Sequence, residues 1–219
     1  MDMGKHSPSA IASGAGFAAD IWIRIDKAVK KLGGTDLDIH RIGLDDFIER
    51  IAGLLMEGAN RLLDFVGTVV VPAVERFVAA DHFVVDTSGK RPVRIAFLGD
   101  NFKRHFLGKI EVGVAVANLR IHRLKVLSRD IPIITELGGE ARAETALAHL
   151  FHLLSLQPNG GSGTLLTNGY ANIFYVRDER KNLWAVYAFW SAADGGWNVF
   201  VFSIEHPNEW SVGNQVLSS

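Results

Sequence analysis

The sequence predicts an α+β protein in which an N-terminal helical region precedes a helix and a four-stranded antiparallel meander. Two observations carry this prediction. Apolar residues recur at helical spacing in the first third of the chain, and residues 164–204 consist of short apolar runs separated by turn-forming residues. Among the 219 residues, 48% are hydrophobic and 21% are charged, which is typical of a globular chain with a sizeable core.

The first 82 residues are expected to be mostly helical. Residues 1–20 are rich in Ala, Gly and Ser and lack the continuous apolar core of a signal peptide, so a flexible arm is predicted. A helical region is predicted over residues 21–82, and its first part, residues 21–32, fits either a short strand or a helix. Within it, Asp46 and Glu49 have the spacing of a capping box, and apolar residues then follow at helical spacing. Because proline lacks an amide donor, Pro72 is expected to kink this helix or to begin a second one.

Residues 83–139 are predicted to form a basic segment that contains β-strands and short helices. Apolar residues that alternate with small or basic residues favour strands, and Asp100 is placed to cap a brief helix. A second short helix is expected after Asp130 and ends at Gly138 and Gly139. The expected strands are 93–98, 112–116 and 119–127.

Residues 140–219 have the clearest pattern. Apolar residues lie on one side of a helix predicted over 140–157, and a stretch of proline and glycine ends it. Asn168 and Gly169 are typical of a two-residue hairpin turn. The four strands predicted after the helix are 164–167, 170–177, 183–190 and 197–204. A helix followed by an antiparallel meander is similar in architecture to cystatin-like α+β rolls, which serve many functions.

The net charge of −1 conceals an uneven distribution of charge along the chain. Residues 1–89 carry a net charge of −4, residues 90–129 carry +8, and residues 130–219 carry −5. The positive segment predicts a surface for phosphates, nucleic acid or an acidic protein. Alternatively, its cations pair with the flanking acidic segments within the fold. The candidate anion-binding residues are Arg120, His122, Arg123 and Lys125.

Aromatic side chains are concentrated in the last part of the sequence. Eleven of the 21 Phe, Trp and Tyr residues lie between Tyr170 and Trp210. The strand predicted over 183–190 is apolar on both faces, so the face opposite the helix must be covered by a second layer or by a partner. The N-terminal helices, a second copy of the chain or a ligand would each provide this cover. For a ligand pocket between helix 140–157 and the sheet, the candidate residues are Tyr170, Trp184, Tyr187 and Trp190.

Few residues indicate catalysis or metal binding. The absence of cysteine excludes disulfides and thiolate chemistry. His149 and His152 share a helical face, but two histidines without a third ligand are better explained as part of a solvated helix side. The glycine-rich loop 159–164 follows a helix and leads into a strand, which is the reverse of a phosphate-binding loop. No cofactor or metal is therefore predicted, and no residue is assigned a catalytic role.

Three functions are consistent with the sequence. The first is a non-enzymatic binding or assembly protein that forms a homo-oligomer, because the apolar content exceeds what the predicted layers cover. The second is a small ligand-binding or enzymatic roll, and the third is a protein that binds an anionic partner or nucleic acid through residues 90–129. No apolar run is long enough to cross a membrane, so a cytoplasmic protein without membrane contact is expected.

Overall fold

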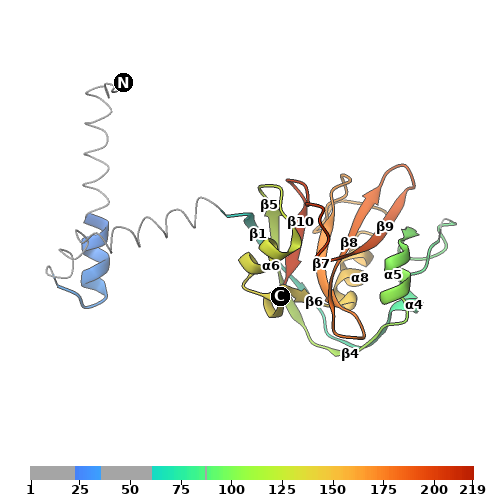
Figure 1. Ribbon diagram of the computed structural model, residues 1–219, viewed down its shortest axis with the longest axis horizontal. Helices are drawn as coiled ribbons and strands as arrows, with labels where there is room; N and C mark the ends of the chain where they lie inside the picture. Colours follow the sequence, from blue (N-terminus) through green and yellow to red (C-terminus); the bar gives the residue numbers. More distant parts are fainter. Residues whose placement is uncertain (1–22, 36–60, 87) are drawn as a thin grey trace, which may run out of the picture. The chain divides into compact units, whose positions relative to one another are not determined.

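The computed structural model describes residues 23–35, 61–86 and 88–219. The chain divides into two compact units, Met1–Asn60 and Arg61–Ser219. The second unit holds all the strands that the structure describes, and its elements are labelled in Figure 1.

The described part of the first unit is a short helix. Residues 23–31 are helical, and Lys30 pairs with Asp26, one turn earlier, at 2.9 Å. The arm expected over residues 1–20 and the capping box at Asp46 lie outside the described residues. Both therefore stay predictions.

The second unit is an α+β fold built on a large mixed sheet, so the predicted fold class is confirmed in this coarse form. The sheet has eight strands in the order β1-β5-β10-β7-β8-β9-β3, and β6 pairs with β7 beside this path. A separate two-stranded sheet consists of β2 and β4. The strands are β1 (Leu63–Val71), β2 (Val74–Val78), β3 (Ile95–Leu98), β4 (Ile110–Val114), β5 (Ala117–Leu124), β6 (Glu144–Thr145), β7 (Asn172–Arg177), β8 (Leu183–Ser191), β9 (Gly196–Ser203) and β10 (Gln215–Ser218).

The helices of this unit are short, and one of them is buried in the core. They are α4 (Ala79–His82), α5 (Asp100–His105), α6 (Asp130–Leu137), α7 (Glu140–Ala143) and α8 (Leu147–Leu156). The expected strand 93–98 and the expected helices after Asp100 and Asp130 correspond to β3, α5 and α6. Gly138 ends α6 with φ +98°, a left-handed conformation that glycine adopts without steric cost.

The helix predicted to extend through Pro72 is wrong in its described part. Leu63–Val71 and Val74–Val78 are strands, paired with β5 and β4 respectively. β-branched residues dominate positions 66–71 and favour the extended backbone. Pro72 separates two strands instead of kinking a helix. Strand pairing ends at Val71 and resumes at Val74, because proline has no N–H to donate to a neighbouring strand.

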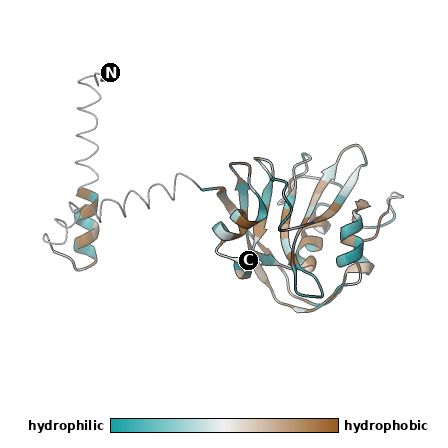
Figure 2. Cartoon of the chain, in the orientation of Figure 1, coloured by the Kyte–Doolittle hydropathy of each residue, from teal (hydrophilic) through white to brown (hydrophobic). Residues whose placement is uncertain are grey.

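The helix predicted over 140–157 is also wrong as a single element. α7 and α8 are separated by β6, which pairs in parallel with β7 while the Thr145 hydroxyl donates to the Tyr175 carbonyl at 3.1 Å. α8 is buried around most of its circumference, since it contacts β1, β4 and α4 as well as the large core. Figure 1 shows α8 behind β7 and β8, and Figure 2 shows it as more hydrophobic than α5.

A buried carboxylate fixes the start of α8. Glu111 on β4 accepts hydrogen bonds from the backbone N–H groups of Leu147 (3.0 Å) and Ala148 (2.9 Å). Its charge is balanced by Lys109, whose Nζ lies 2.8 Å from Oε1. Glu111 therefore satisfies helix N–H groups that have no partner within the helix.

Three of the four predicted meander strands are present as β7, β8 and β9. Residues 164–167 are not a strand, and Asn168–Gly169 does not close a hairpin. The Asn172 side chain binds both the N–H (2.8 Å) and the carbonyl (3.0 Å) of Leu166, so an amide replaces the expected strand pairing. The place beside β7 is taken by β10, which the sequence did not indicate.

Candidate functional site

The two faces of β8 and β9 are covered differently. On one face, Val186 and Ala188 belong to the core that surrounds α8. On the other face, α6 supplies Ile133 and Ile134, and the loop after β9 supplies Trp210, to a second core. Part of the face opposite α8 is therefore covered by α6 and by Trp210. Beyond Trp210, however, aromatic side chains remain partly exposed.

Five of these side chains form what we call the aromatic face: Phe97 from β3, Tyr187 and Phe189 from β8, and Phe200 and Phe202 from β9. Phe200 is central, with ring centroids 5.3 Å from Phe97, 5.6 Å from Tyr187 and 5.9 Å from Phe189. Phe97 is 44% exposed, and the other four are intermediate in burial. Contiguous, partly exposed rings of this kind mark a surface suited to an apolar or aromatic ligand.

Two pockets border the aromatic face and share Phe202. One, of about 260 Å³, lies over Phe97 and Phe200 next to Gly99. A Cβ at Gly99 would lie only 2.8 Å from the Phe200 ring, so glycine permits this close approach. The other pocket, of about 140 Å³, we call the Asp130 pocket. It is lined by Asp130, Phe202, His206, Asn208, Glu209, Trp210, Ser211 and Asn214.

Asp130 is a buried carboxyl group at the wall of its pocket. It is 1% exposed, and its Oδ1 accepts hydrogen bonds from the Tyr175 hydroxyl (2.8 Å) and from Trp210 Nε1 (2.7 Å). Burial raises the pKa of Asp130 to about 6, although these two hydrogen bonds and the nearby His206 act in the opposite direction. A buried carboxyl with a raised pKa in a pocket is a recognised indicator of a functional site.

The raised pKa of Asp130 predicts a specific dependence of stability on pH. Because the folded protein binds the proton more tightly than the unfolded chain, stability from this group is greatest below about pH 4. It is lost as the pH rises through about 6, and a shift from 3.8 to about 6 corresponds to about 3 kcal/mol. Asp130→Asn should remove this loss, because its amide oxygen still accepts both donors.

Urea denaturation of both proteins at pH 4.5 and 7.5 measures this effect. At each pH, the free energy of unfolding of Asp130→Asn is compared with that of the parent chain. The difference should favour the variant more at pH 7.5 than at pH 4.5. Glu75→Gln removes an exposed carboxylate on β2 and should leave the pH dependence unchanged. An identical pH dependence in the parent and Asp130→Asn would contradict the assigned titration.

A second buried polar group at the aromatic face is Asn198 and, unlike Asp130, it has an oxygen without a partner among the described residues. Asn198 on β9 is 8% exposed and donates from Nδ2 to Asp194 at 3.1 Å, which orients its amide. Its Oδ1 is buried without a hydrogen-bond partner. In register, Asn198 lies between Phe189 on β8 and Phe97 on β3. A buried acceptor without a donor is costly, so this position favours an incoming donor.

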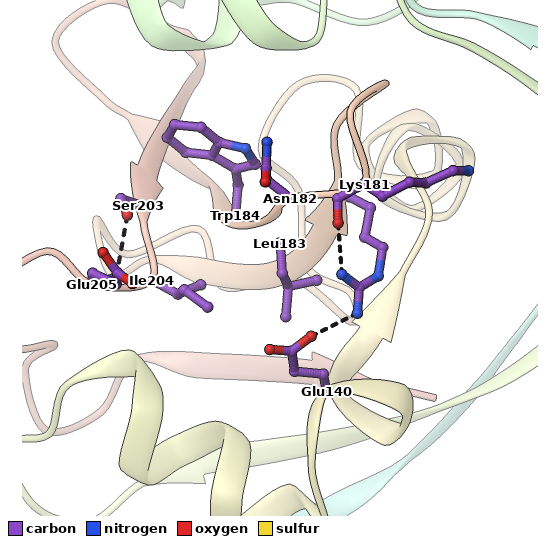
Figure 3. Close-up of a pocket in the computed structure, with 9 residues that line it drawn as sticks. Glu140, Lys181, Asn182, Leu183, Trp184, Ser203, Ile204 and Glu205 are labelled. Carbon is purple, nitrogen blue, oxygen red and sulfur yellow. Dashed lines mark hydrogen bonds and ion pairs between the residues drawn. The ribbon is translucent and has the colours of Figure 1, made fainter.

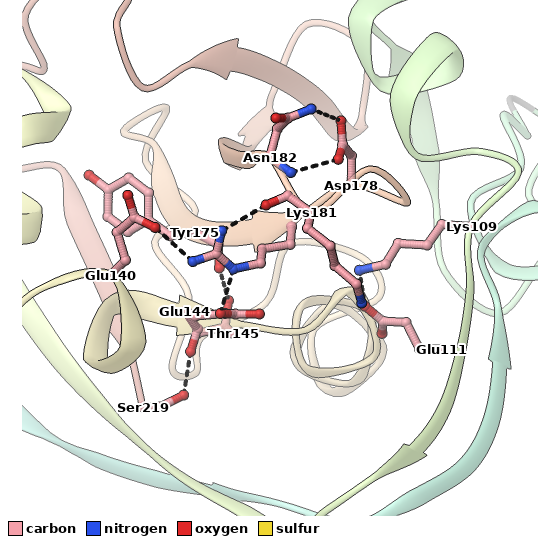
Figure 4. Close-up of polar contacts among 11 residues, drawn as sticks. Lys109, Glu111, Glu140, Glu144, Thr145, Tyr175, Asp178, Lys181, Asn182 and Ser219 are labelled. Atoms are coloured by element: carbon pink, nitrogen blue, oxygen red, sulfur yellow. Dashed lines mark hydrogen bonds and ion pairs between the residues drawn. The ribbon is translucent and has the colours of Figure 1, made fainter.

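A third pocket, of about 380 Å³, lies at the ends of β7 and β9 (Figure 3). Its guanidinium is already neutralised, because Arg177 contacts Glu140 at 2.7 Å and Glu144 at 2.9 Å (Figure 4). Arg177 also donates to the Lys181 carbonyl at 2.7 Å. The guanidinium of Arg177 is therefore not available to bind an anion in this pocket.

The structure does not bring the four predicted ligand-binding residues together. Trp184 packs beside His105, with ring centroids 4.3 Å apart, and donates to Asp178 at 3.1 Å. Trp190 packs against Trp197, and Tyr170 lies near Gly213 and is 42% exposed. Only Tyr187 belongs to the aromatic face. Where the pocket was expected, leucines of α8 and apolar residues of the sheet form the core instead.

The four predicted anion-binding residues lie on β5 and just after it, and all four have intramolecular contacts. Arg123 donates to the Gly213 carbonyl and to Gln215 Oε1, both at 3.2 Å, and Lys125 pairs with Asp64 at 3.4 Å. His122 is buried beside Phe65, and burial together with Arg120 lowers its pKa. Arg120 lies over the Phe65 ring. Alternation along the strand places Arg120 and His122 on one face and Arg123 on the other.

The sheet order separates the cations of residues 90–129. β5 lies next to the β1 end of the sheet, whereas β3 forms the opposite end. Arg94, which directly precedes β3, therefore lies near the opposite edge of the sheet from Arg120 and Arg123. Two described ion pairs are internal to the segment, Lys103 with Asp100 and Lys109 with Glu111. The net charge of the segment consequently does not translate into one continuous positive surface.

His149 is buried, contrary to the solvated position expected for it. Its Nδ1 accepts the Ala146 N–H at 3.2 Å, and its Nε2 is buried without a partner. Burial lowers its pKa. Within the described residues, no cluster of three or more His, Cys, Asp or Glu side chains is placed to hold a metal ion. No helix in that part of the chain is long and apolar enough to span a membrane.

The sequence offered no direct signal for the Asp130 pocket. The sequence indicates Asp130 only as the start of a short helix, and His206 and Trp210 belong to a loop that separates β9 from β10. Folding brings these residues together with Tyr175 from β7. Comparison of the chain with protein-family models, with curated proteins and with solved structures gives no significant match.

Proposed function

We propose that this chain is a binding protein that takes a small ring-containing ligand on the aromatic face. The observation that carries the proposal is the pair of pockets that share Phe202 on a face where α8 provides no cover. Ligand sites are typically concave, mostly apolar and equipped with few polar groups. Asp130 lines the smaller pocket and would supply a polar group of this kind. Asn198, whose Oδ1 has no partner among the described residues, lines neither pocket but lies in register between Phe97 and Phe189 of the same face.

Binding of ring compounds should depend on Phe97. We expect Phe97→Ala to weaken binding of benzyl alcohol about fivefold or more, because one ring contact contributes about 1 kcal/mol. Phe65→Ala is the matched control, since Phe65 is similarly exposed at 56% but lies on β1. Protein NMR titration of the full chain measures both affinities. If benzyl alcohol and charged ring compounds leave the aromatic face unperturbed, the proposed function is wrong.

A second candidate function is self-association, favoured by the exposed edge of the large sheet. β1 pairs only with β5, so its outer backbone groups lack a strand partner among the described residues. Phe65, Val66 and Val70 are each more than half exposed on this strand. Two copies of an edge strand can pair antiparallel about a two-fold axis, and such exposed edges favour association.

Light scattering coupled to size exclusion tests this candidate. We expect a dimer whose fraction increases with concentration, and Val70→Lys should shift it to the monomer because a lysine at the edge opposes strand pairing. Val85→Lys introduces the same charge at an exposed valine outside β1 and should leave the dimer intact. A strict monomer at high concentration would exclude self-association through β1.

A further inference from the structure

The Asp130 pocket joins two features that recognise cations. Asp130 and Glu209 are its two acidic residues, and His206 is its basic one. Trp210 and Phe202 contribute aromatic rings, whose faces attract cations. The wider segment, residues 130–219, is also acidic, with a net charge of −5.

The rings around Asp130 are held in place by one another. Phe202 stacks on His206 with ring centroids 4.6 Å apart and an interplanar angle of 12°. Tyr187 meets Trp210 edge to face at 4.9 Å, which links the pocket to the aromatic face. A ligand that enters the pocket can therefore extend along Phe202 onto that face without crossing a gap in the apolar surface.

From this arrangement we propose that the Asp130 pocket binds the ammonium group of a cationic ligand, while the ring of the same ligand lies on the aromatic face. The inference rests on the proposed function and names the chemical class of the ligand. An ionised carboxylate that is buried among apolar rings is poorly solvated, so a bound cation would compensate its charge. The volume of about 140 Å³ suits a compact group and requires the rest of the ligand to lie outside.

Three ring compounds, one cationic, one neutral and one anionic, distinguish this inference from the proposed function. They are benzyltrimethylammonium, benzyl alcohol and benzenesulfonate, titrated calorimetrically into the full chain at pH 7.5. We expect the cation to bind about tenfold more tightly than the neutral alcohol, which corresponds to one cation–π or charge contact. Benzenesulfonate should bind more weakly than either.

Variants locate the preference in the pocket. Asp130→Asn should lower the affinity for benzyltrimethylammonium to that for benzyl alcohol. The affinity for benzyl alcohol itself should change by no more than about twofold. Glu209→Gln, which alters a residue outside the core, should lower only the affinity for the cationic probe, by about twofold to threefold. Glu75→Gln removes the same charge from β2 and should change neither. Because Glu209→Gln leaves the buried hydrogen bonds intact, it keeps the test valid if Asp130→Asn fails to fold.

The pH dependence provides an independent readout. Between pH 7.5 and 5, binding of benzyltrimethylammonium should weaken about tenfold as Asp130 takes up a proton, since its pKa is about 6. The groups that face Asp130 are Tyr175 on β7 and, from the loop, Trp210 and His206, with Glu209 also lining the pocket. His206→Gln should retain this pH dependence. Its disappearance in that variant would assign the titration to His206 and overturn the role of Asp130.

The outcomes separate the two proposals. Equal binding of the three probes, or a preference for benzenesulfonate, would overturn the ammonium inference and leave the ring-binding function supported. Binding of none of the three would overturn both. A preference for the cation that survives unchanged in Asp130→Asn and Glu209→Gln would place the cation site elsewhere and also overturn the inference.

Discussion

Glu111→Ala should destabilise the protein by about 3–5 kcal/mol, because it removes one partner from a buried, hydrogen-bonded charge pair. The substitution would leave the N–H groups of Leu147 and Ala148 without acceptors at the start of the most buried helix. It would also leave Lys109 without its counter-charge, although that side chain is only 15% exposed. Chemical denaturation measures the loss as a change in the free energy of unfolding.

Glu140→Ala is the matched control for this experiment. Glu140 also pairs with a cation, Arg177, at 2.7 Å, but its side chain is 51% exposed. Exposed pairs contribute at most about 1 kcal/mol, so the control should lose no more than that. Glu111→Gln should fall between the two, since its amide oxygen accepts an N–H but does not neutralise Lys109. A loss below about 1 kcal/mol for Glu111→Ala would contradict the role assigned to Glu111.

Gly160→Ala should cost about 3 kcal/mol, the combined effect of backbone strain and overpacking. Gly160 has φ +68°, and a Cβ there would lie 2.3 Å from two ring atoms of Trp190. Trp190 cannot easily yield, because it packs edge to face on the fully buried Trp197 at 5.6 Å. Thermal and urea denaturation would record the destabilisation.

Gly169→Ala separates the two contributions to the Gly160 effect. Gly169 has φ +88° in the same connection between α8 and β7, but a Cβ there would meet nothing within 4 Å. It should therefore cost only the backbone strain, about 1–2 kcal/mol. If the two alanine variants were equally destabilised, the contact between Gly160 and Trp190 would carry no energetic weight. Trp190→Leu in the Gly160→Ala background should recover part of the loss.

Local signals were reliable where an element depends on its own residues. The strand at β3 follows from alternation, and the end of α6 follows from glycine conformation. The short helix α5 is present as expected, but the predicted capping role of Asp100 is wrong: Gly99 is the N-cap, Asp100 is the first helical residue, and no side chain caps the helix. β1 was misread because its exposed positions also hold apolar residues such as Val66 and Val70, so the sequence lacks the alternation of apolar and polar residues that marks a half-buried strand. Its valines matched helical spacing by coincidence, and their β-branched character was the better indicator.

Elements and sites defined by distant partners could not be predicted. β10 is buried on both faces and only four residues long, so its sequence has no strand periodicity. His149 was expected in solvent because α8 was assumed to have one wet side, whereas β4 and α4 also contact this helix. The Asp130 pocket depends on donors 45 and 80 residues away in the sequence, Tyr175 and Trp210. No local pattern records such contacts.

The position of β10 has a consequence for how the chain folds during synthesis. β10 lies between β5 and β7, so in the sheet it is the strand that joins β1-β5 to β7-β8-β9-β3. The other described strands all emerge from the ribosome before it does, which leaves β5 and β7 with open edges in the nascent chain. Closure of the sheet by β10 therefore comes after the synthesis of every other described strand, and a peptide of sequence 214–219 supplied in trans would compete for the place between β5 and β7.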